Sequence, residues 1–432
     1  MASTKHFTDD FKAAPYWWDA LAPRTLEQID VPPTADVVVV GAGLTGTSAA
    51  TTLARAGRDV VVVEREYPGY GASTRNAGFV GRHFKHSLTD LLKKFDQTTA
   101  LSYFHELQRI FDFAIDMIKS EGLDCGLQEN GRFIAAMNQP DFDTLKAEYA
   151  LRGKLLNEEF SIVEDGGATE YRSPKVIGGV LLREQAAIHP GLYANAMAQR
   201  AVVAGARIIS GTAMLGLRRS GEKFIVSTER GDIVCNDVLI ATNGYSGDAV
   251  KWVRRRLIPI RSYIVATEPL PQAMLDDLLP HNRTYTDRRK ASNYLRLSTD
   301  GTRIVFGGQT GAELEDQPEQ SGLKVRDEMI GIFPQLADVR LSHSWSGRCA
   351  GTIDLIPKLG VKNGVHFALA YCFSGNALAP YLGHHAALRI LGQGSQDIAF
   401  EARSFHAIPF YNGNPWFMPL VKKYYEWADR LR

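Results

Sequence analysis

Residues 36–64 carry a pattern that few folds accommodate. A continuous run of β-branched residues at 36–40 predicts a strand buried on both faces, and residues 59–64 predict a second one. Between them, Gly41-Ala42-Gly43-Leu44-Thr45-Gly46 has the G-x-G-x-x-G spacing and leads into small, helix-compatible residues. Strand, turn, helix and strand in this order form a right-handed β-α-β unit.

Each glycine of this turn has a physical role. Gly41 permits the tight turn, Gly43 lets a pyrophosphate approach the backbone, and Gly46 lets the helix pack on the strand. The free N–H groups and the positive end of the helix then face the phosphates. Glu64 ends the second strand, where its carboxylate can accept hydrogen bonds from ribose hydroxyls. The unit predicts a dinucleotide site, and by itself it does not distinguish FAD from NAD.

Length and composition limit the other function classes. A chain of 432 residues predicts two or three domains. Its net charge of +1 argues against broad electrostatic binding of nucleic acid or of an anionic membrane. The four cysteines form no C-x-x-C pair, which excludes a zinc ribbon and a thioredoxin-like motif, and no metal site is expected. Without an apolar secretory segment or a long apolar run, we expect a cytoplasmic protein.

The α/β pattern recurs later in the chain. Strand-like residues at 207–209, 238–241 and 366–370 accompany helical stretches at 191–205 and 379–391, and residues 216–235 resemble a hairpin. Residues 257–339 are mostly strand-like. The pattern predicts one nucleotide-binding domain built from separated segments, with a second domain inserted between them.

Several motifs along nearly the whole chain resemble one known family. They are Tyr16-Trp17-Trp18, Gly71-Ala72-Ser73-Thr74-Arg75-Asn76-Ala77-Gly78, Ile188-His189-Pro190, Ala241-Thr242-Asn243-Gly244, Tyr294-Leu295-Arg296 with Phe306-Gly307-Gly308, Trp345-Ser346-Gly347, Asp354-Leu355-Ile356-Pro357, and Phe373-Ser374-Gly375-Asn376-Ala377. With them the chain resembles the FAD-dependent amine and amino-acid oxidases of the D-amino-acid oxidase superfamily, which include glycine and sarcosine oxidases. It is most similar to gamma-glutamylputrescine oxidases.

The resemblance implies an α/β fold. We expect a discontinuous Rossmann-type FAD-binding domain of residues 1–90, 155–250 and 340–432. An inserted α+β substrate domain with an antiparallel sheet would comprise residues 91–154 and 251–339. The cofactor implied is non-covalent FAD, and the expected contacts are Gly41, Gly43, Leu44, Thr45, Gly46, Glu64, Arg65, Ala72, Ser73, Thr74, Asn76, Ala77, Gly78, Thr242, Asn243, Gly244, Gly347, Ser374, Gly375, Asn376, Ala377 and Leu378.

The chain also departs from the family pattern. Thr74 and Ala77 replace two glycines of the segment that follows the acidic strand end. Asn376 replaces a histidine near the flavin; its amide can donate a hydrogen bond but cannot supply a positive charge. Ala379 stands where sarcosine oxidases have a lysine for the substrate carboxylate. Cys349 lies too close to Asp354 to match the cysteine that tethers FAD in some relatives.

The chemistry implied is oxidation of a C–N bond by hydride transfer to flavin N5. Hydrolysis of the imine and reoxidation by O₂ to hydrogen peroxide would follow. Arg82 and His83 follow the flavin-proximal segment and would attract an anion, or else form a solvated basic turn. Arg296 is either a carboxylate clamp or salt-bridged in the fold. With Tyr263, Tyr294 and Arg348 these residues predict an anionic secondary amine, of the N-substituted glycine or iminodiacetate type.

Other readings stay open at this point. They are a gamma-glutamylputrescine-like polyamine oxidase, a flavin dehydrogenase with an acceptor other than O₂, a nicotinamide-dependent dehydrogenase, and a flavin-bearing protein without turnover. We expect a monomer or a small homo-oligomer with no nucleic-acid partner.

Overall fold

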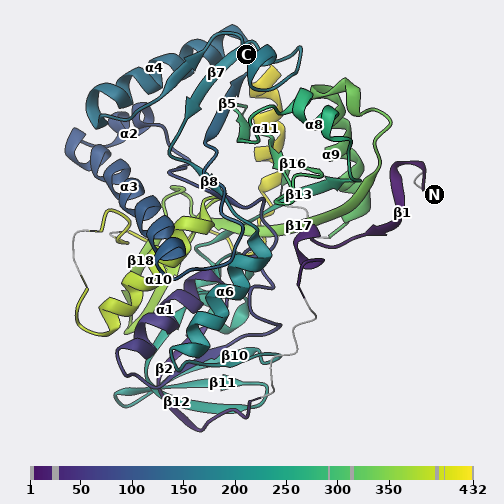
Figure 1. Ribbon diagram of the computed structural model, residues 1–432. Coiled ribbons are helices and arrows are strands. Elements are labelled where there is room, and N and C mark those ends of the chain that lie inside the picture. Colours follow the sequence, from purple (N-terminus) through teal and green to yellow (C-terminus); the bar gives the residue numbers. More distant parts are fainter. Residues whose placement is uncertain are drawn as a thin grey trace.

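Two large sheets organise the molecule in the computed structural model, which describes residues 4–21, 29–289, 292–311, 316–394, 398–402 and 404–430 (Figure 1). Six strands of the eight-stranded sheet follow one another in the order β10 (Met214–Ser220), β11 (Lys223–Thr228), β12 (Gly231–Ile240), β2 (Thr34–Val40), β3 (Val60–Val63) and β9 (Arg207–Ile209). The other two strands branch from β12, which also pairs with β19 (Val365–Leu369), and β19 pairs with β18 (Lys358–Lys362). The two-stranded ribbon joins β4 (Phe79–Val80) to β8 (Ala186–Ala187).

The centre of the eight-stranded sheet is parallel, as the β-branched runs predict. Val37 and Val39 of β2 pack on one side with helices α1 (Leu44–Arg55), α6 (Pro190–Val203) and α10 (Gly375–Ile390). Val38 and Val40 face a second apolar cluster on the other side. Both faces of β2 are therefore buried, which is why its sequence shows no alternation. The α/β class predicted from sequence is confirmed.

The nine-stranded sheet is mostly antiparallel and lies above the first in Figure 1. Its order is β1 (Phe7–Lys12), β17 (Leu341–Gly351), β13 (Ile258–Thr267), β16 (Ile304–Gly311), β15 (Tyr294–Leu297), β14 (Thr284–Asp287), β5 (Arg132–Ala136), β7 (Gly178–Leu182) and β6 (Ser161–Val163). One apolar cluster packs β13, β15 and β16 against α8 (Gln272–Leu278) and α9 (Pro318–Ile332).

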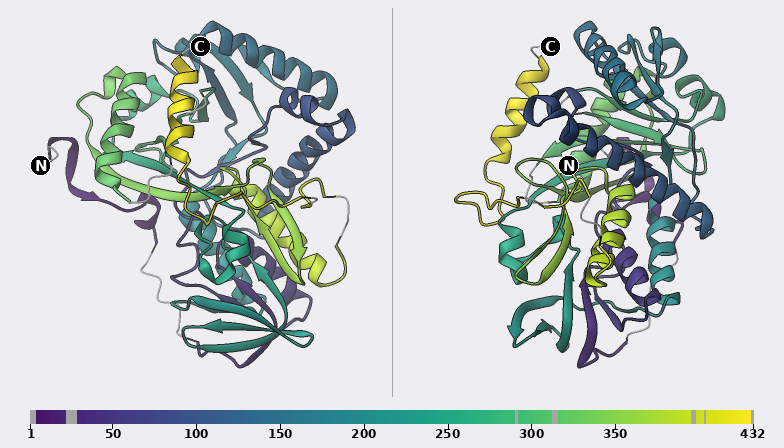
Figure 2. Two further views of the ribbon diagram at one scale, coloured as in Figure 1. Left: turned by 180° about the vertical axis from the view of Figure 1, so that it is seen from behind. Right: turned by 90° about the vertical axis from the view of Figure 1, so that its left-hand side faces the viewer.

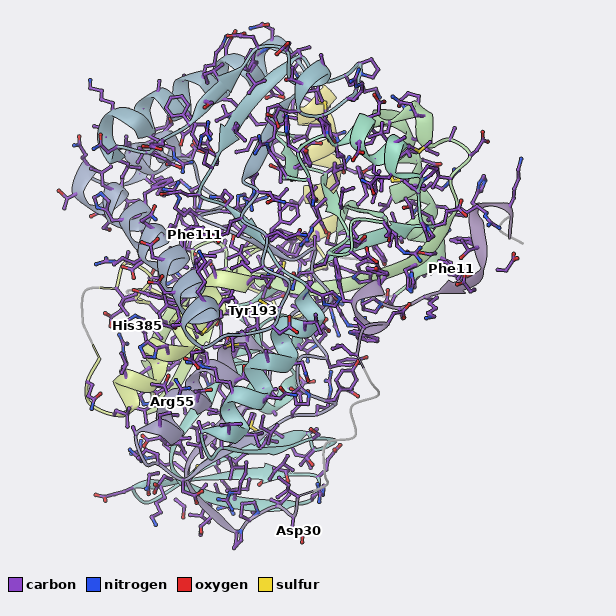
Figure 3. The ribbon with its side chains drawn as sticks, in the orientation of Figure 1. Phe11, Asp30, Arg55, Phe111, Tyr193 and His385 are labelled. Atoms are coloured by element: carbon purple, nitrogen blue, oxygen red, sulfur yellow. The ribbon has the colours of Figure 1, made fainter. Side chains whose placement is uncertain are left out.

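The remaining helices are α2 (Leu88–Lys94), α3 (Gln97–Ser120), α4 (Gln139–Leu156), α5 (Gly166–Thr169), α7 (Lys251–Arg254) and α11 (Met418–Arg430). Phe111 of α3 and Tyr193 of α6, both labelled in Figure 3, belong to the same buried cluster as α1 and α10. None of the helices in the described ranges has the length and apolar character needed to cross a bilayer.

The domain boundaries expected from the sequence do not coincide with the division of the strands between the two sheets. Strands β1, β6, β7 and β17 lie in the nine-stranded sheet, although their residues were expected in the FAD-binding domain. Conversely, α3 was expected in the substrate domain but packs against α10. The chain crosses between the two halves several times, with β17 running across the middle and β10–β12 at the end far from α4 (Figures 1 and 2). Hydrophobic periodicity identifies strands but does not say which sheet a strand joins.

The N-terminal arm is fastened by its aromatic residues. Trp17 is fully buried, packs edge-to-face on Trp345 and His189, and donates its Nε1–H to the carbonyl of Asn76 at 2.8 Å. Trp18 donates to Thr74 Oγ1 at 2.9 Å. The arm therefore holds the segment that follows β3, far from it in sequence.

His189 makes the stability of this region sensitive to pH. Its Nδ1 accepts the N–H of Leu192 and so caps α6, which requires an uncharged ring. Burial lowers the pKa of His189 from 6.5 to about 4. As the pH falls, His189 therefore binds a proton in the unfolded chain at a higher pH than in the folded protein. The free energy of unfolding decreases as the pH falls from 6.5 towards 4. Between pH 7.5 and pH 5 we expect His189 to contribute a loss of about 2 kcal/mol.

Urea unfolding of the wild type and of His189→Asn at both pH values measures this contribution. Asparagine also caps helices but does not titrate, so the variant should lose about 2 kcal/mol less on acidification. Equal losses in the two proteins would rule out His189 as the titrating group.

Candidate functional site

A cavity of about 1130 Å³ runs between the two sheets. One end is formed by the β2–α1 turn and by the ends of β3 and β12. The middle is lined by residues 71–79, by β17 and by the start of α10, and the other end by β5, α4 and residues 81–87. In an α/β sheet, ligands bind beyond the carboxyl ends of the strands, which is where the first end lies.

The β2–α1 turn has the geometry that its glycines predict. Gly41 has a φ of +101°, and a Cβ on Gly46 would lie 1.9 Å from the carbonyl oxygen of Gly41. A Cβ on Gly43 would have only Ser73 Oγ nearby, at 3.0 Å. Ser73 Oγ in turn accepts the N–H of Leu44 at 3.1 Å. The turn is thus open on the side where a phosphate would approach the helix N-terminus.

Glu64 lies across this turn. Its carboxylate accepts the N–H of Ala42 at 2.8 Å and that of Glu66 at 3.0 Å, and burial raises the pKa of Glu64. Glu64 and the neighbouring Arg65 line the cavity, as does Thr45, whose Oγ1 lies 2.7 Å from the hydroxyl of Tyr371. The carboxylate is in place to accept ribose hydroxyls.

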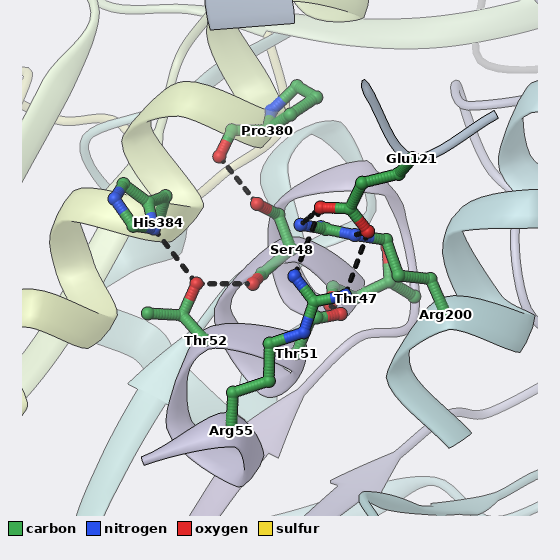
Figure 4. Close-up of polar contacts among 9 residues, drawn as sticks. All are labelled: Thr47, Ser48, Thr51, Thr52, Arg55, Glu121, Arg200, Pro380 and His384. Carbon is green, nitrogen blue, oxygen red and sulfur yellow. Dashed lines mark hydrogen bonds and ion pairs between the residues drawn. The ribbon is translucent and has the colours of Figure 1, made fainter. Parts of the chain in front are cut away.

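Helix α1 is anchored on the side away from the cavity (Figure 4). Ser48 Oγ donates to the carbonyl of Pro380 at 2.7 Å, and Thr52 Oγ1 lies 2.9 Å from His384 Nδ1. Glu121 accepts hydrogen bonds from both Arg55 and Arg200, so α1, α3 and α6 meet at one carboxylate. These contacts fix the direction in which the N-terminus of α1 points.

The segment 71–78 lines the middle of the cavity in part. Ala72, Ser73, Asn76 and Ala77 are lining residues, whereas Thr74 and Gly78 are not. Thr74 points inward and donates to the carbonyl of Gly69 at 2.8 Å. Gly78 has a φ of +81° and faces the carbonyl oxygen of Ile188, which would lie 2.2 Å from a Cβ. These two residues support the conformation of the segment on the side away from the cavity.

A strained turn precedes α10. Ala370, Cys372 and Phe373 all have positive φ, although none is glycine, and the N–H of Ala370 is held by Asn243 Oδ1 at 2.9 Å. Such strain is concentrated at functional sites. Ser374 lines the cavity where the turn ends, and its buried hydroxyl has no partner among the described residues. The N-terminus of α10 therefore offers unused donors to a ligand.

Asn376 lines the cavity, but its side-chain amide is used within the chain. Its Nδ2 donates to Asn76 Oδ1 and to the carbonyl of Phe79, both at 2.9 Å, and so joins α10 to the segment 71–79. Ala377 and Leu378 are buried in the α1–α10 packing and do not line the cavity.

Four other expected contacts lie around β17. Thr242, Asn243 and Gly347 line the cavity. Gly244 does not line it; a Cβ there would lie 2.6 Å from the carbonyl oxygen of Cys349, so Gly244 lets this turn approach β17.

The structure separates the expected substrate residues into two groups. Arg82, His83, Tyr294 and Arg348 line the cavity. Arg348 lies over the ring of Tyr245 at 4.9 Å, and Tyr294 Oη lies 2.9 Å from Ser262 Oγ. Arg82 is largely committed to Gln108 at 2.6 Å and to Glu158 at 3.2 Å. The His83 side chain is exposed to the cavity space, and its enclosure there, with Arg132 nearby, lowers its pKa.

Arg296 and Tyr263 lie elsewhere. As expected, the Arg296 side chain is on the face of β15 opposite to Leu295 and Leu297. It lies two residues beyond Tyr294 on that face, under the ring of Trp17. Its guanidinium donates to the carbonyl of Ile188 at 2.7 Å and to Gln128. Tyr263 is buried in the cluster under α9. Neither lines the cavity. Of the two roles left open for Arg296, the contacts favour one within the fold, although carbonyl and amide oxygens take the place of a carboxylate there.

Several cavity residues were missed by sequence reasoning, and Arg132 is one of them. Arg132 is 4% exposed, and it lines the cavity from β5. The available signal was a lone arginine in an apolar strand, the same signal that drew attention to Arg296.

Known proteins are similar to this chain along most of its length. A family model described as DAO, FAD dependent oxidoreductase, matches residues 36–389. The gamma-glutamylputrescine oxidoreductase of Escherichia coli is 27% identical over 92% of this chain and 93% of its own. The glycine oxidase structure from Geobacillus kaustophilus aligns with a TM-score of 0.73 and 21% identity, over 88% of this chain and 99% of that one. The iminodiacetate oxidase structure from Chelativorans aligns with a TM-score of 0.71 and 20% identity, over 86% and 98%.

Proposed function

The chain belongs to the DAO family of FAD-dependent oxidoreductases, and from this premise we propose that it oxidises a C–N bond in an amine or amino acid that carries a carboxylate. FAD is its cofactor, which leaves no role for a nicotinamide at the β2–α1 turn. The relatives include enzymes named for an amine and for amino acids, which supports this class of substrate.

The cavity fits FAD on two observations. Gly43 and Ser73 leave the N-terminus of α1 open to a pyrophosphate, and the orphan hydroxyl of Ser374 lies at the N-terminus of α10. We assign the nucleotide end to Gly41, Gly43, Leu44, Thr45, Glu64 and Arg65. The flavin end would contact Ala72, Ser73, Asn76, Ala77, Gly347, Ser374 and Gly375. The positive end of α10 would stabilise negative charge on a reduced ring.

Bound FAD supplies the two-electron acceptor that the side chains lack. The chain's own part is to bind, orient and exclude water. The amine would become an imine, water would hydrolyse it to a carbonyl compound and a second amine, and O₂ would take the electrons to give hydrogen peroxide. No side chain has to remove a proton from carbon on this route, so His83 is not required as a base.

The observation that favours an anionic substrate is the charge of the cavity wall. Arg348 and Lys85 both line the cavity and, among the described residues, neither has a carboxylate partner. They rest on aromatic rings instead, those of Tyr245 and Phe373. A carboxylate of an N-substituted glycine or an iminodiacetate would pair with Arg348, which is partly buried, and with Lys85, which is exposed.

The test is to incubate the flavin-loaded protein in air with iminodiacetate, sarcosine, glycine, a D-amino acid and a gamma-glutamyl polyamine. Peroxide and carbonyl product should form in equal amounts with a carboxylate-bearing amine. Carbonyl product without peroxide, formed only with an added dye, would assign a dehydrogenase. Turnover of the gamma-glutamyl polyamine, which itself carries a carboxylate, and of none of the short amino acids would favour the second candidate, a polyamine oxidase, which the Escherichia coli relative supports.

Asn376 is expected to control flavin affinity indirectly. In Asn376→Asp, a carboxylate that cannot donate would face the oxygens of Asn76 and Phe79. The loss of both hydrogen bonds and the repulsion between oxygens should cost about 1–3 kcal/mol of flavin binding, which is a rise of about 5- to 150-fold in the Kd of FAD. Fluorescence titration of apoprotein measures it. Asn412→Asp, at an exposed site where the side chain only accepts, is the control, and equal Kd values would refute this role.

A further inference from the structure

The C-terminal segment leaves large apolar side chains outside the core. They are Phe410, which is 98% exposed, and Trp416, Leu420, Tyr424 and Trp427, which are 53–64% exposed. The last three are spaced i, i+4 and i+7, so they lie along one face of α11. Figure 2 shows α11, in yellow, at the edge of the molecule in the right-hand view. Single apolar residues on a surface need no explanation, but a run of them in one segment indicates a contact surface.

The folded chain holds these side chains outside. Phe417 packs in an apolar cluster with β13. The rings of Tyr411 and Phe417 are 5.8 Å apart, and the hydroxyl of Tyr411 donates to the carbonyl of Leu257 at 2.8 Å. Phe410 and Trp416 are the chain neighbours of these two anchored rings and remain exposed. Their exposure therefore accompanies a fixed backbone on either side.

A basic run lies directly against this segment. Residues 251–256, which include α7, contain one lysine and three arginines. The N–H of Ile408 donates to the carbonyl of Arg255 at 3.1 Å, two residues before Phe410. The basic run and the exposed aromatic residues therefore belong to one surface.

Most of the cations on this surface have no counter-charge. Arg254 forms an ion pair with Asp248. Lys251 and Arg255 are exposed, and neither has a carboxylate partner among the described side chains. The same holds for Lys423, which is exposed on α11. A net charge of +1 for the whole chain thus conceals a local cationic surface.

The chemistry of this surface indicates what it contacts. Trp and Tyr are enriched where a bilayer meets water, because each has an apolar body and a polar edge. Lysine and arginine are attracted to anionic lipid headgroups. A second copy of the chain fits less well, since a twofold contact would bring the cationic surface against itself.

We propose that this basic–aromatic surface, made of Lys251, Arg255, Phe410, Trp416 and the exposed face of α11, binds an anionic lipid bilayer. The apolar side chains enter the headgroup region, and the cations pair with lipid phosphates. The first turn of α11 also lines the cavity, so binding holds the cavity next to the membrane. This association is independent of the reaction proposed above.

The experiment is flotation of the FAD-loaded protein with vesicles of phosphatidylcholine, or of phosphatidylcholine with one third phosphatidylglycerol, at low and high salt. The wild type should bind the anionic vesicles more strongly than the neutral ones, and salt should weaken the binding. Lys251→Gln with Arg255→Gln should lower the partition coefficient for anionic vesicles by about 30-fold. Phe410→Ser with Trp416→Ser should lower it by about tenfold or more for both kinds of vesicle.

Matched controls make the same changes elsewhere. Val203→Ser, at the end of α6, and Lys223→Gln, in β11, both replace exposed residues outside the basic–aromatic surface and should bind vesicles as the wild type does. Flavin content should be unchanged in all of these variants. The proposal is overturned if the wild type does not float with anionic vesicles, or if both double variants float as it does. A wild type that ignores vesicles would be tested for a dimer by light scattering and for binding to single-stranded DNA, and either result would assign the surface to that partner instead.

Discussion

Gly46→Ala should yield a protein that is purified without FAD and does not acquire it when FAD is added. The new Cβ would lie 1.9 Å from the carbonyl oxygen of Gly41 and 3.2 Å from a methyl group of Val39. The first of these is backbone, which cannot rotate away, so α1 must shift from β2 and the phosphate-facing turn must open. We expect a loss of about 3 kcal/mol in stability and at least a hundredfold loss in FAD affinity.

The flavin content of the purified variant and its urea unfolding curve measure both effects. Gly216→Ala is the control, because a Cβ at that position in β10 would have no atom within 4 Å. A yellow Gly46→Ala protein with wild-type stability would contradict the packing of α1 against the turn.

Trp17→Ala should destabilise the protein by about 3–5 kcal/mol, which is typical of removing a large buried aromatic residue. Trp17 is wholly buried among Trp345, His189 and Ala77, and its indole N–H satisfies the carbonyl of Asn76. Because Asn76 and Ala77 line the cavity, we expect FAD affinity to fall along with stability.

Trp17→Phe separates the two contributions. It keeps most of the ring volume but leaves the Asn76 carbonyl without its donor, and it should cost about 1–3 kcal/mol. Trp427→Ala, at a position that is 58% exposed, should change stability by less than about 0.5 kcal/mol. Denaturant unfolding of the three variants provides the comparison, and a Trp17→Ala protein as stable as Trp427→Ala would mean that the arm is not part of the folded core.

The parts of the fold that sequence predicted are those set by local patterns. The β-branched runs of β2 and β3, the glycine turn between them and the hairpin β10–β12 all follow from residues close together in the chain. Strand pairing over long separations does not. Nothing in residues 7–12 indicates that β1 pairs with β17, more than three hundred residues later.

For the same reason, sequence alone could not distinguish the roles of Arg296 and Arg132. Each is a single arginine in an apolar strand, and sequence analysis singled out only Arg296. Arg296 lies one pleat past the edge of the cavity, where Trp17 and Ile188 close over the sheet, whereas Arg132 lies inside it. Which of the two meets a ligand depends on where the cavity ends along each strand, and this is a property of the assembled sheets.

The most direct test of the account is the absorbance spectrum of the purified, FAD-loaded protein before and after anaerobic addition of each amine. We predict a yellow protein whose flavin bands are bleached by an amine that carries a carboxylate and are left unchanged by the same amine without one. Flavin bands that respond to no amine, or that respond equally with and without the carboxylate, would contradict the central claim that this cavity oxidises an anionic amine.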